Sequence, residues 1–241
     1  KSIWNKTEDS YIAGDDDQAI FRWAGADVNG FIAQTGKFLK LTQSLRVPRV
    51  VHDVAMNIVK KISKRHHKEW KPKNKTGLLS YYHEFKDVDM SSGDWYVLAR
   101  TRHMLNELEE TLYRKGLYYK NKFKKGYEKD LHEAIIDWEK WRKNNDLNHD
   151  QIKRVASYMS PNHYQKENLQ YLDKDKSYNM TEAYNNQGLK TKTIWYEAFD
   201  SAPQKQISYI RQMRANGEQL NKEPRILLST IHGVKGGECS N

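Results

Sequence analysis

Apolar and polar positions follow two periods along the chain, and these predict strands in some segments and helices in others. Short apolar runs bounded by turn residues indicate strands at 10–14, 37–41, 78–85, 95–100 and 225–231. A helix is predicted from Pro48, followed by one apolar stripe made of Val51, Val54, Ala55, Ile58 and Ile62. A second helix is predicted from His103 to Lys115, ending at Gly116. Strands that alternate with helices in this way favour a parallel α/β sheet.

The pattern changes between about Lys125 and Lys222, where the chain is polar and has little strand character. Helix-period stretches occur at 131–141, 152–159 and 207–213. This texture predicts a helical insertion within the α/β unit. Trp138 and Trp141, three residues apart, are predicted to lie in the core of the insertion rather than to act as a functional pair.

Composition indicates a folded protein without a membrane segment. The chain has 241 residues, of which 37% are hydrophobic and 12% aromatic, enough for a core and too aromatic for a disordered chain. No apolar run approaches the roughly 18 residues of a membrane span, and Lys1–Ser10 lacks a signal peptide's apolar region. The single cysteine, Cys239, excludes an internal disulfide framework and a thiolate zinc cluster. We therefore expect a protein of the reducing cytoplasm.

The net charge of +10 predicts a polyanionic partner, but the charge is unevenly distributed. Residues 1–33 hold three basic and six acidic side chains, whereas residues 34–75 hold twelve basic and two acidic. The excess therefore lies in one stretch of the chain. Much of it follows the helix that begins near Pro48, where it can interact with the helix dipole.

Three clusters carry candidate chemistry. In the first, 14–27, an acidic turn places Gln18 at a predicted sheet edge, and Phe21 and Trp23 alternate around a cation as a stacking platform for bases would. On composition alone, a solvated acidic turn and two core aromatics explain this segment better. In the second, 41–48, Arg46 precedes a helix N-terminus, where a phosphate could meet a guanidinium and free N–H groups. An ion pair is the simpler reading of an isolated arginine.

The third cluster, 228–238, is a strand that runs into a glycine-rich turn bearing His232, Lys235 and Glu238. Such a turn suits phosphate or sugar contacts, although alone it is weak evidence.

The order and spacing of the three clusters resemble motifs III, IV and V of superfamily 1A ATP-dependent DNA helicases, the UvrD/Rep/PcrA group. The residues concerned are Gly-Asp-Asp-Asp-Gln with Ile-Phe-Arg-Trp-Ala-Gly-Ala-Asp, then Gln-Ser-Leu-Arg, then Ser-Thr-Ile-His-Gly-Val-Lys-Gly-Gly-Glu. Val97–Arg102 and Leu108–Glu110 also resemble the family's intervening strand and helix. The similarity covers most of 10–125 and 225–241, whereas the insertion matches in position and length only.

The resemblance implies a role for each matched residue. Gln18 and Arg46 would be catalytic, with Gln18 sensing the γ-phosphate and Arg46 acting as an arginine finger. Glu238 would hold the ATP ribose, and Gly236 and Lys235 would shape the motif V turn. The residues implied in DNA binding are Phe21, Trp23, Arg100, Thr230 and His232. Three departures from the family pattern are Leu45 for a tyrosine that stacks on adenine, Ala24 for an arginine, and Gly237 for a leucine.

The implied fold is a RecA-like parallel α/β sheet of the P-loop NTPase type with an inserted helical subdomain. The domains would be a stub of the first RecA-like domain at 1–36, the second at 37–125, the insertion at 126–222, and the second domain continued at 223–241. The implied ligands are ATP with Mg²⁺, whose protein ligands would lie outside these residues, and single-stranded and duplex DNA. Protein partners at the insertion remain an alternative, and no membrane partner is expected.

The implied activity is translocation on single-stranded DNA and unwinding of duplex with 3′ to 5′ polarity, in repair or replication. The chain has no G-x-x-x-x-G-K-[ST] loop, and motifs I, II and VI are absent, so we expect these residues alone to be inactive. Two alternatives stay open: the helicase portion of a helicase–nuclease, and a non-catalytic DNA-binding module on a helicase-like fold.

Other candidate sites are weaker. Asp15–Asp17 is a poor magnesium site because three adjacent carboxylates are expected to point in different directions, and His66 and His67 do not share a helical face. The 115–130 stretch interleaves lysines with aromatic residues, which fits a nucleic-acid surface and a solvated connector equally well. No hydrolase triad is apparent.

Overall fold

A computed structural model of the chain describes residues 10–20, 22–124 and 129–239. The chain divides into two compact units, Lys1–Tyr82 and His83–Asn241. The boundaries that the sequence predicts at 36, 125 and 222 stay a prediction. Among the described residues, no helix has both the length and the apolar character needed to cross a membrane.

The second unit contains a three-stranded parallel sheet in the order β1 (Trp95–Ala99), β5 (Ile226–Thr230), β2 (Tyr119–Asn121). The central strand, β5, pairs with β1 from Trp95↔Ile226 to Ala99↔Thr230, and with β2 from Tyr119↔Ile226 to Asn121↔Leu228. The prediction of a mixed α/β fold with a parallel sheet is therefore confirmed, and the sheet is compatible with a RecA-like core.

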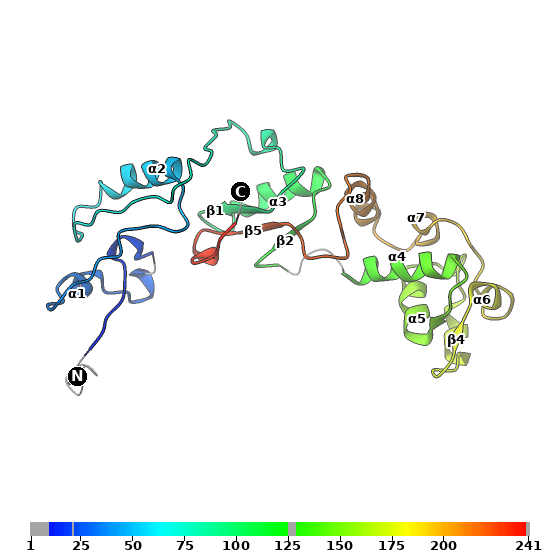
Figure 1. The fold of residues 1–241 in the computed structure, drawn as a ribbon. Helices are drawn as coiled ribbons and strands as arrows, with labels where there is room; N and C mark the ends of the chain where they lie inside the picture. Colours follow the sequence, from blue (N-terminus) through cyan, green and yellow to red (C-terminus); the bar gives the residue numbers. More distant parts are fainter. Residues whose placement is uncertain (1–9, 21, 125–128, 240–241) are drawn as a thin grey trace. The chain divides into compact units, whose positions relative to one another are not determined.

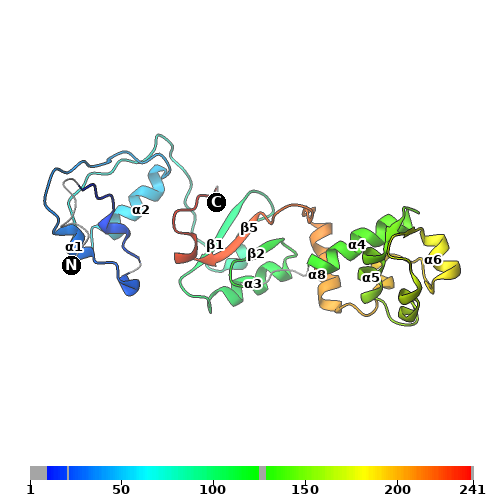
Figure 2. The same cartoon turned by 90° about the horizontal axis from the view of Figure 1, so that it is seen from below.

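Helix α3 (Leu105–Arg114) lies against this sheet (Figures 1 and 2). Its predicted apolar face is confirmed. Leu105 and Leu112 are buried, and Leu108 packs on the same core as Val97 and Leu228. The helix ends where the sequence predicts. Gly116 takes a φ of +62°, and the next amide, that of Leu117, donates to the Leu112 carbonyl, which is a typical glycine-stopped helix end.

Between β2 and β5 the chain is mainly helical. The elements are α4 (Lys129–Arg142), β3 (Leu147–Asn148), α5 (His149–Ser157), η5 (Lys166–Tyr171), β4 (Ser177–Tyr178), α6 (Met180–Asn186), α7 (Trp195–Ala198) and α8 (Gln204–Ala215). Strands β3 and β4 form a short antiparallel pair. Trp138 and Trp141 are fully buried in the core of this region, as predicted, and their indole N–H groups donate to the carbonyls of Thr193 and Tyr178.

Helix α8 fastens this helical region to the end of α3. The Tyr209 ring stacks on Tyr113 with centroids 4.1 Å apart, and its hydroxyl donates to the Leu117 carbonyl at 2.7 Å. Asn216, the C-cap of α8, donates to the carbonyls of Lys115 and Gly116. Helix α8 therefore packs against the end of α3, including the backbone at Gly116.

The first unit contains η2 (Asp16–Gln18), η3 (Arg22–Ala24), α1 (Val28–Ile32) and α2 (Arg49–Val59). Helix α2 is the predicted helix, with Pro48 as its N-cap rather than its first residue. Its apolar stripe is only partly covered by the described residues: Val54 and Ala55 are half-buried, whereas Val51 is 42% and Ile58 63% exposed.

Three predicted strands are wrong: the structure describes 10–14, 37–41 and 78–85 and gives none of them strand structure. Residues within them, such as Leu39, Leu41 and Leu78, are 85–90% exposed. A strand requires a partner for its backbone groups. Among the described residues of this unit, ladder pairing is limited to an isolated bridge between Gln43 and Lys71. The second unit's η4 (Phe85–Asp87) begins where the third of these segments ends.

Candidate functional site

Gln18 is the last residue of the η2 turn, and Asp15 holds it there. Asp15 is the N-cap of the turn: its Oδ1 accepts from the Asp17 amide at 3.1 Å and its backbone carbonyl accepts from the Gln18 amide. The Gln18 side chain donates from Nε2 to Asp15 Oδ2 at 2.6 Å. The side chain is exposed but is fixed to the turn that carries it.

The three carboxylates of this turn converge, contrary to the prediction. The ligand oxygens of Asp15, Asp16 and Asp17 all lie within 4.8 Å of one another, because a lysine from the other end of the unit lies among them. Lys68 Nζ is 2.8 Å from Asp15 and 3.1 Å from Asp17, and it also contacts Asp16. Lys68 therefore lies among the three carboxylates, and with Arg65 it compensates part of their charge.

The electrostatics of this cluster follow from burial and pairing. Burial raises the pKa values of Asp16 and Asp17, but hydrogen bonds and charge from Lys68, with the His66 amide at Asp16 and Arg65 at Asp17, outweigh it and lower both. Burial likewise opposes the charge of Lys68, yet its hydrogen bonds to the three aspartates raise its pKa. Asp16, Asp17 and Lys68 are therefore charged at neutral pH.

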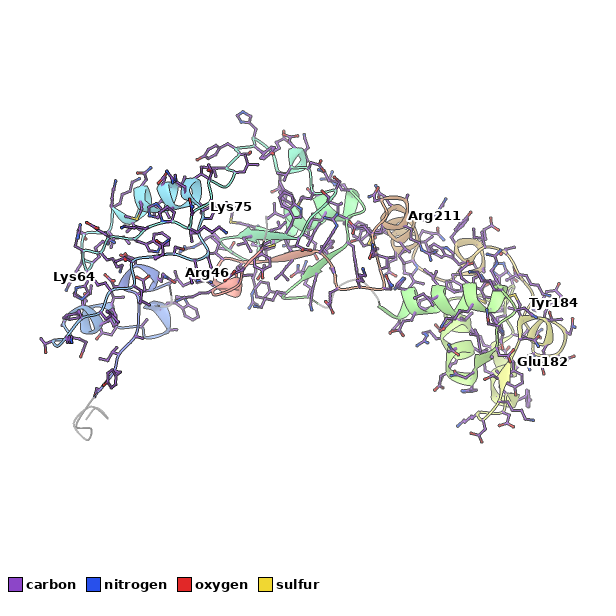
Figure 3. All side chains as sticks on the ribbon, in the orientation of Figure 1. Arg46, Lys64, Lys75, Glu182, Tyr184 and Arg211 are labelled. Carbon is purple, nitrogen blue, oxygen red and sulfur yellow. The ribbon has the colours of Figure 1, made fainter. Side chains whose placement is uncertain are left out.

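Arg46 lies in a loop that hydrogen bonds hold in place (Figure 3). The buried Ser44 accepts at its hydroxyl from the amides of Arg46 and Val47, at 3.3 and 3.0 Å. The Ser44 amide donates to the Lys71 carbonyl, and the Lys71 amide donates to that of Thr42. The Arg46 residue itself is exposed.

The N-terminus of α2 is less open than predicted. The amides of Arg49 and Val50 donate to the carbonyls of Lys75 and Thr76, at 3.0 and 3.1 Å. The expectation that free N–H groups flank Arg46 is therefore wrong for these two. The segment after the helix folds back and supplies acceptors that a local sequence pattern does not show.

The predicted stacking platform is described only in part. Trp23 lies in η3 and is 78% exposed, which is compatible with stacking and excludes the core alternative for this side chain. Phe21 lies outside the described residues. Leu45, which replaces the tyrosine that the resemblance places against adenine, is 86% exposed.

The remaining predicted residues lie in the second unit, at the carboxyl edge of the parallel sheet. Arg100 follows β1, Thr230 ends β5, and Ala99 pairs with Thr230, so the two chain segments leave the sheet side by side. The Ile231 amide donates to the Ala99 carbonyl at 3.1 Å. Thr230 is nearly buried, and its hydroxyl accepts from the Gly233 amide at 3.2 Å, so it caps the turn.

The glycine-rich turn after β5 contains η6 (His232–Val234) and is tightly built. A Cβ at Gly233 would lie 2.5 Å from Ser229 Oγ, and one at Gly237 would lie 3.0 Å from Tyr96 Oη. Gly236 has a φ of +87°, so this turn requires glycine for conformation as well as for space. His232 is half-buried, whereas Lys235, Gly236 and Glu238 are exposed.

Lys122 and Phe123 support this turn, a role that the sequence did not predict for the 115–130 stretch. Lys122 donates from Nζ to the Gly233 carbonyl, and its amide donates to that of Leu228 at 3.0 Å. Phe123 packs beside the turn, and the Arg102 guanidinium lies 4.3 Å from its ring centroid. The interleaved lysines and aromatic residues of 115–130 were the sequence feature that could have pointed to this supporting role. Neither alternative considered for that stretch included the strand β2, and Tyr127 lies outside the described residues.

A separate cavity of about 650 Å³ lies beside β2 and α4 and contains none of the predicted site residues. Its lining includes Tyr118, Tyr119, Lys120, His132 and Glu223. Burial, with a smaller effect from the charge of Arg214, lowers the pKa of His132. The lining mixes cations, carboxylates and phenols, so it favours no single ligand class.

The predicted residues thus form two groups. Gln18, Trp23 and Arg46 lie in the first unit, and Arg100, Thr230, His232, Gly236 and Glu238 lie in the second. Within each group they occupy turns and loop positions that local hydrogen bonds define.

Comparison with known proteins gives a partial match. No family model and no solved structure matches the chain. Over 142 residues it is 27% identical to the ATP-dependent DNA helicase PcrA of Bacillus subtilis strain 168. The match covers 49% of this chain and 19% of PcrA, so it spans about a fifth of that protein's length. It supports a relationship to UvrD/PcrA-like helicases.

Proposed function

We propose that this chain is part of an ATP-dependent DNA helicase that translocates on single-stranded DNA and unwinds duplex with 3′ to 5′ polarity. The observation that carries the proposal is the ordered set of three clusters, together with the 27% identical match to PcrA. The parallel sheet would be the core of a RecA-like domain, and 126–222 would be its inserted helical subdomain.

The proposed ATP contacts are those that the resemblance implies, residue by residue. Gln18 contacts the γ-phosphate, and Arg46 places a fixed positive charge on it as the charge of the transition state develops. Gly236 allows the motif V turn to approach the nucleotide, and Glu238 accepts from the ribose. The protein ligands of Mg²⁺ are expected elsewhere, because the carboxylates of the acidic turn already pair with Arg65 and Lys68.

The proposed DNA contacts are made by the exposed Trp23 in the first unit and, separately, by residues at the carboxyl edge of the sheet in the second. Trp23 and Phe21 stack on bases, which tolerates any sequence, as a translocating enzyme requires. Arg100 and His232 contact the strand at the sheet edge, and Thr230 positions that edge through its bond to Gly233.

The test is the substitution Arg46→Ala in the longer protein that contains this chain, with Arg49→Ala as the matched control. Arg49 is also exposed and lies only three residues away, at the first position of α2. Arg46→Ala is expected to lower DNA-stimulated ATP turnover by roughly 10³-fold or more, because it removes an arginine finger. Single-strand affinity should stay unchanged in both variants, and Arg49→Ala should retain turnover.

Turnover that survives Arg46→Ala would favour a non-catalytic DNA-binding module instead. The 241 residues alone are expected to show no steady-state ATP hydrolysis, because they lack the phosphate-cradling G-x-x-x-x-G-K-[ST] loop. Measured hydrolysis by this chain alone would contradict the expectation that it cannot hydrolyse ATP without that loop.

A further inference from the structure

The acidic turn at Asp15–Asp17 is held by residues some fifty positions later in the chain. Arg65 forms a bidentate pair with Asp17, with Nε–Oδ1 at 2.9 Å and Nη2–Oδ2 at 2.7 Å. Lys68 bonds all three aspartates. The His66 amide donates to Asp16 Oδ2 at 2.7 Å. One short segment, 65–68, therefore contacts the carboxylates of all three aspartates.

The cluster is shielded from solvent, so its charges depend on one another. The side chains of Asp16 and Asp17 are 3% and 10% exposed, and that of Arg65 is 16% exposed. Removing one partner from such a pair leaves the other charge desolvated and uncompensated, which costs more than the pair itself contributes. A fork of two parallel N–H···O bonds also fixes orientation, which a single point charge does not.

The cluster is connected to both residues of this unit that are proposed to contact the γ-phosphate, Gln18 and Arg46. On one side, Asp15 contacts Lys68 and accepts from the Gln18 side chain. On the other side, the chain continues from Lys68 to Lys71, whose carbonyl accepts from the Ser44 amide. Ser44 in turn fixes the loop that carries Arg46. Side-chain and backbone contacts, joined by the chain from Lys68 to Lys71, therefore link Gln18 to the Arg46 loop.

We propose that Arg65 and Lys68 are positioning residues, which hold the Gln18 turn in register with the Arg46 loop. The proposal rests on the proposed function for the meaning of that register, since Gln18 and Arg46 act on one phosphate only in that function. The ion cluster itself does not depend on it. Neither Arg65 nor Lys68 contacts the nucleotide in this scheme; each acts through the turn.

The structural arm of the test uses this chain and needs no enzymatic activity. Amide hydrogen exchange at His66 reports the cluster directly, because that N–H donates to Asp16. Lys68→Met should speed its exchange by about tenfold or more, since a local opening no longer has to break the ion cluster. Lys68→Arg should retain most of the protection. Lys64→Met is the matched control, because Lys64 is exposed and lies in the same segment (Figure 3), and it should leave the exchange unchanged.

The functional arm uses the longer protein. Lys68→Met should lower kcat for ATP by about tenfold while leaving KM for ATP and single-strand affinity within about twofold, because the interaction lost is one made in the transition state. Lys68→Arg should restore kcat. A merely structural role for Lys68 would change all three quantities together.

The two failures are distinguishable. If the unaltered longer protein hydrolyses no ATP, the proposed function fails while the exchange result still stands. If it hydrolyses ATP and Lys68→Met keeps the full kcat, the positioning role is overturned and the helicase assignment survives. If Lys68→Met does not fold, Asp17→Asn takes its place, because it removes one charge of the Arg65 pair at nearly constant shape, and the same expectations apply.

Discussion

At the scale of single residues, hydrogen bonds rather than residue type decide what each candidate side chain can do. Thr230 and Ser44 both use their hydroxyls to cap turns, so they shape the edges on which other groups stand. Trp23, by contrast, is 78% exposed although aromatic residues usually contribute to a core. Exposure of a large ring in a tight turn is the residue-scale feature that favours a ligand role.

The first prediction concerns that ring. Trp23→Ala should weaken single-strand binding by about 1–3 kcal/mol, the usual value of a base–aromatic stack. Trp23→Phe is the control, because it keeps a π-face and should retain most of the affinity. The measurement is a fluorescence anisotropy titration with a labelled oligonucleotide at fixed salt. Equal affinity for Trp23→Ala and the unaltered protein would remove Trp23 from the proposed DNA site.

At the scale of elements, the sequence predicted best those with a clear apolar pattern and clear end signals. Helices α2 and α3 and strands β1 and β5 were predicted because their apolar periods are long and their ends carry clear signals, such as Gly116. Strand β2 was missed because Tyr-Lys-Asn has no apolar run; it forms because β5 offers it a parallel partner. The segments 10–14, 37–41 and 78–85 show the reverse, with strand-like composition and no strand structure.

The second prediction concerns the junction of α3 and α8. Gly116 has a φ of +62°, and a Cβ there would lie 2.4 Å from Gln212 Cγ on α8. Gly116→Ala should therefore destabilise the second unit through both backbone strain and displacement of α8. Gly217→Ala is the matched control: its φ is +76°, but a Cβ there meets nothing within 4 Å.

Gly217→Ala should cost only the backbone term, about 1–2 kcal/mol, and Gly116→Ala distinctly more. Urea unfolding followed by far-ultraviolet circular dichroism gives both values. Equal losses in the two variants would show that α8 yields to the new Cβ without cost, and that the contact is not a tight one.

At the scale of the whole molecule, the charge distribution has a different meaning from the one its sum suggests. The excess of cations in 34–75 predicts a broad polyanion-binding surface. In the structure, two of the twelve cations in that stretch, Arg65 and Lys68, pair with the acidic turn of the N-terminal segment. The sequence could identify each charge run but not their pairing, because the partners are about fifty residues apart. The acidic turn and the glycine-rich turn were predictable from local sequence; the ion cluster that holds the acidic turn was not.

That pairing makes the stability of the first unit depend on pH in a defined direction. The pKa values of Asp16 and Asp17 are lowered below their usual 3.8 in the folded chain. A group with a depressed folded pKa contributes stability that is present above its unfolded pKa and is lost as pH falls through its folded pKa. The contribution of the cluster should therefore be complete near neutral pH, begin to weaken near pH 4, where the aspartates of the unfolded chain take up protons, and be lost as pH falls through the lower folded pKa values.

The third prediction follows from that sign. Lys68→Met should destabilise the first unit strongly at pH 7, where it removes the lysine that contacts the buried Asp16 carboxylate, and less at pH 3, where the aspartates of the variant, no longer held ionised by Lys68, take up protons. Denaturant unfolding of the two proteins at both pH values, followed by hydrogen exchange at His66, measures the difference. Lys64→Met should show no such pH dependence, because Lys64 is exposed and outside the cluster. A Lys68→Met penalty equal at pH 7 and pH 3 would mean that Lys68 stabilises the unit by packing of its aliphatic stem rather than by charge.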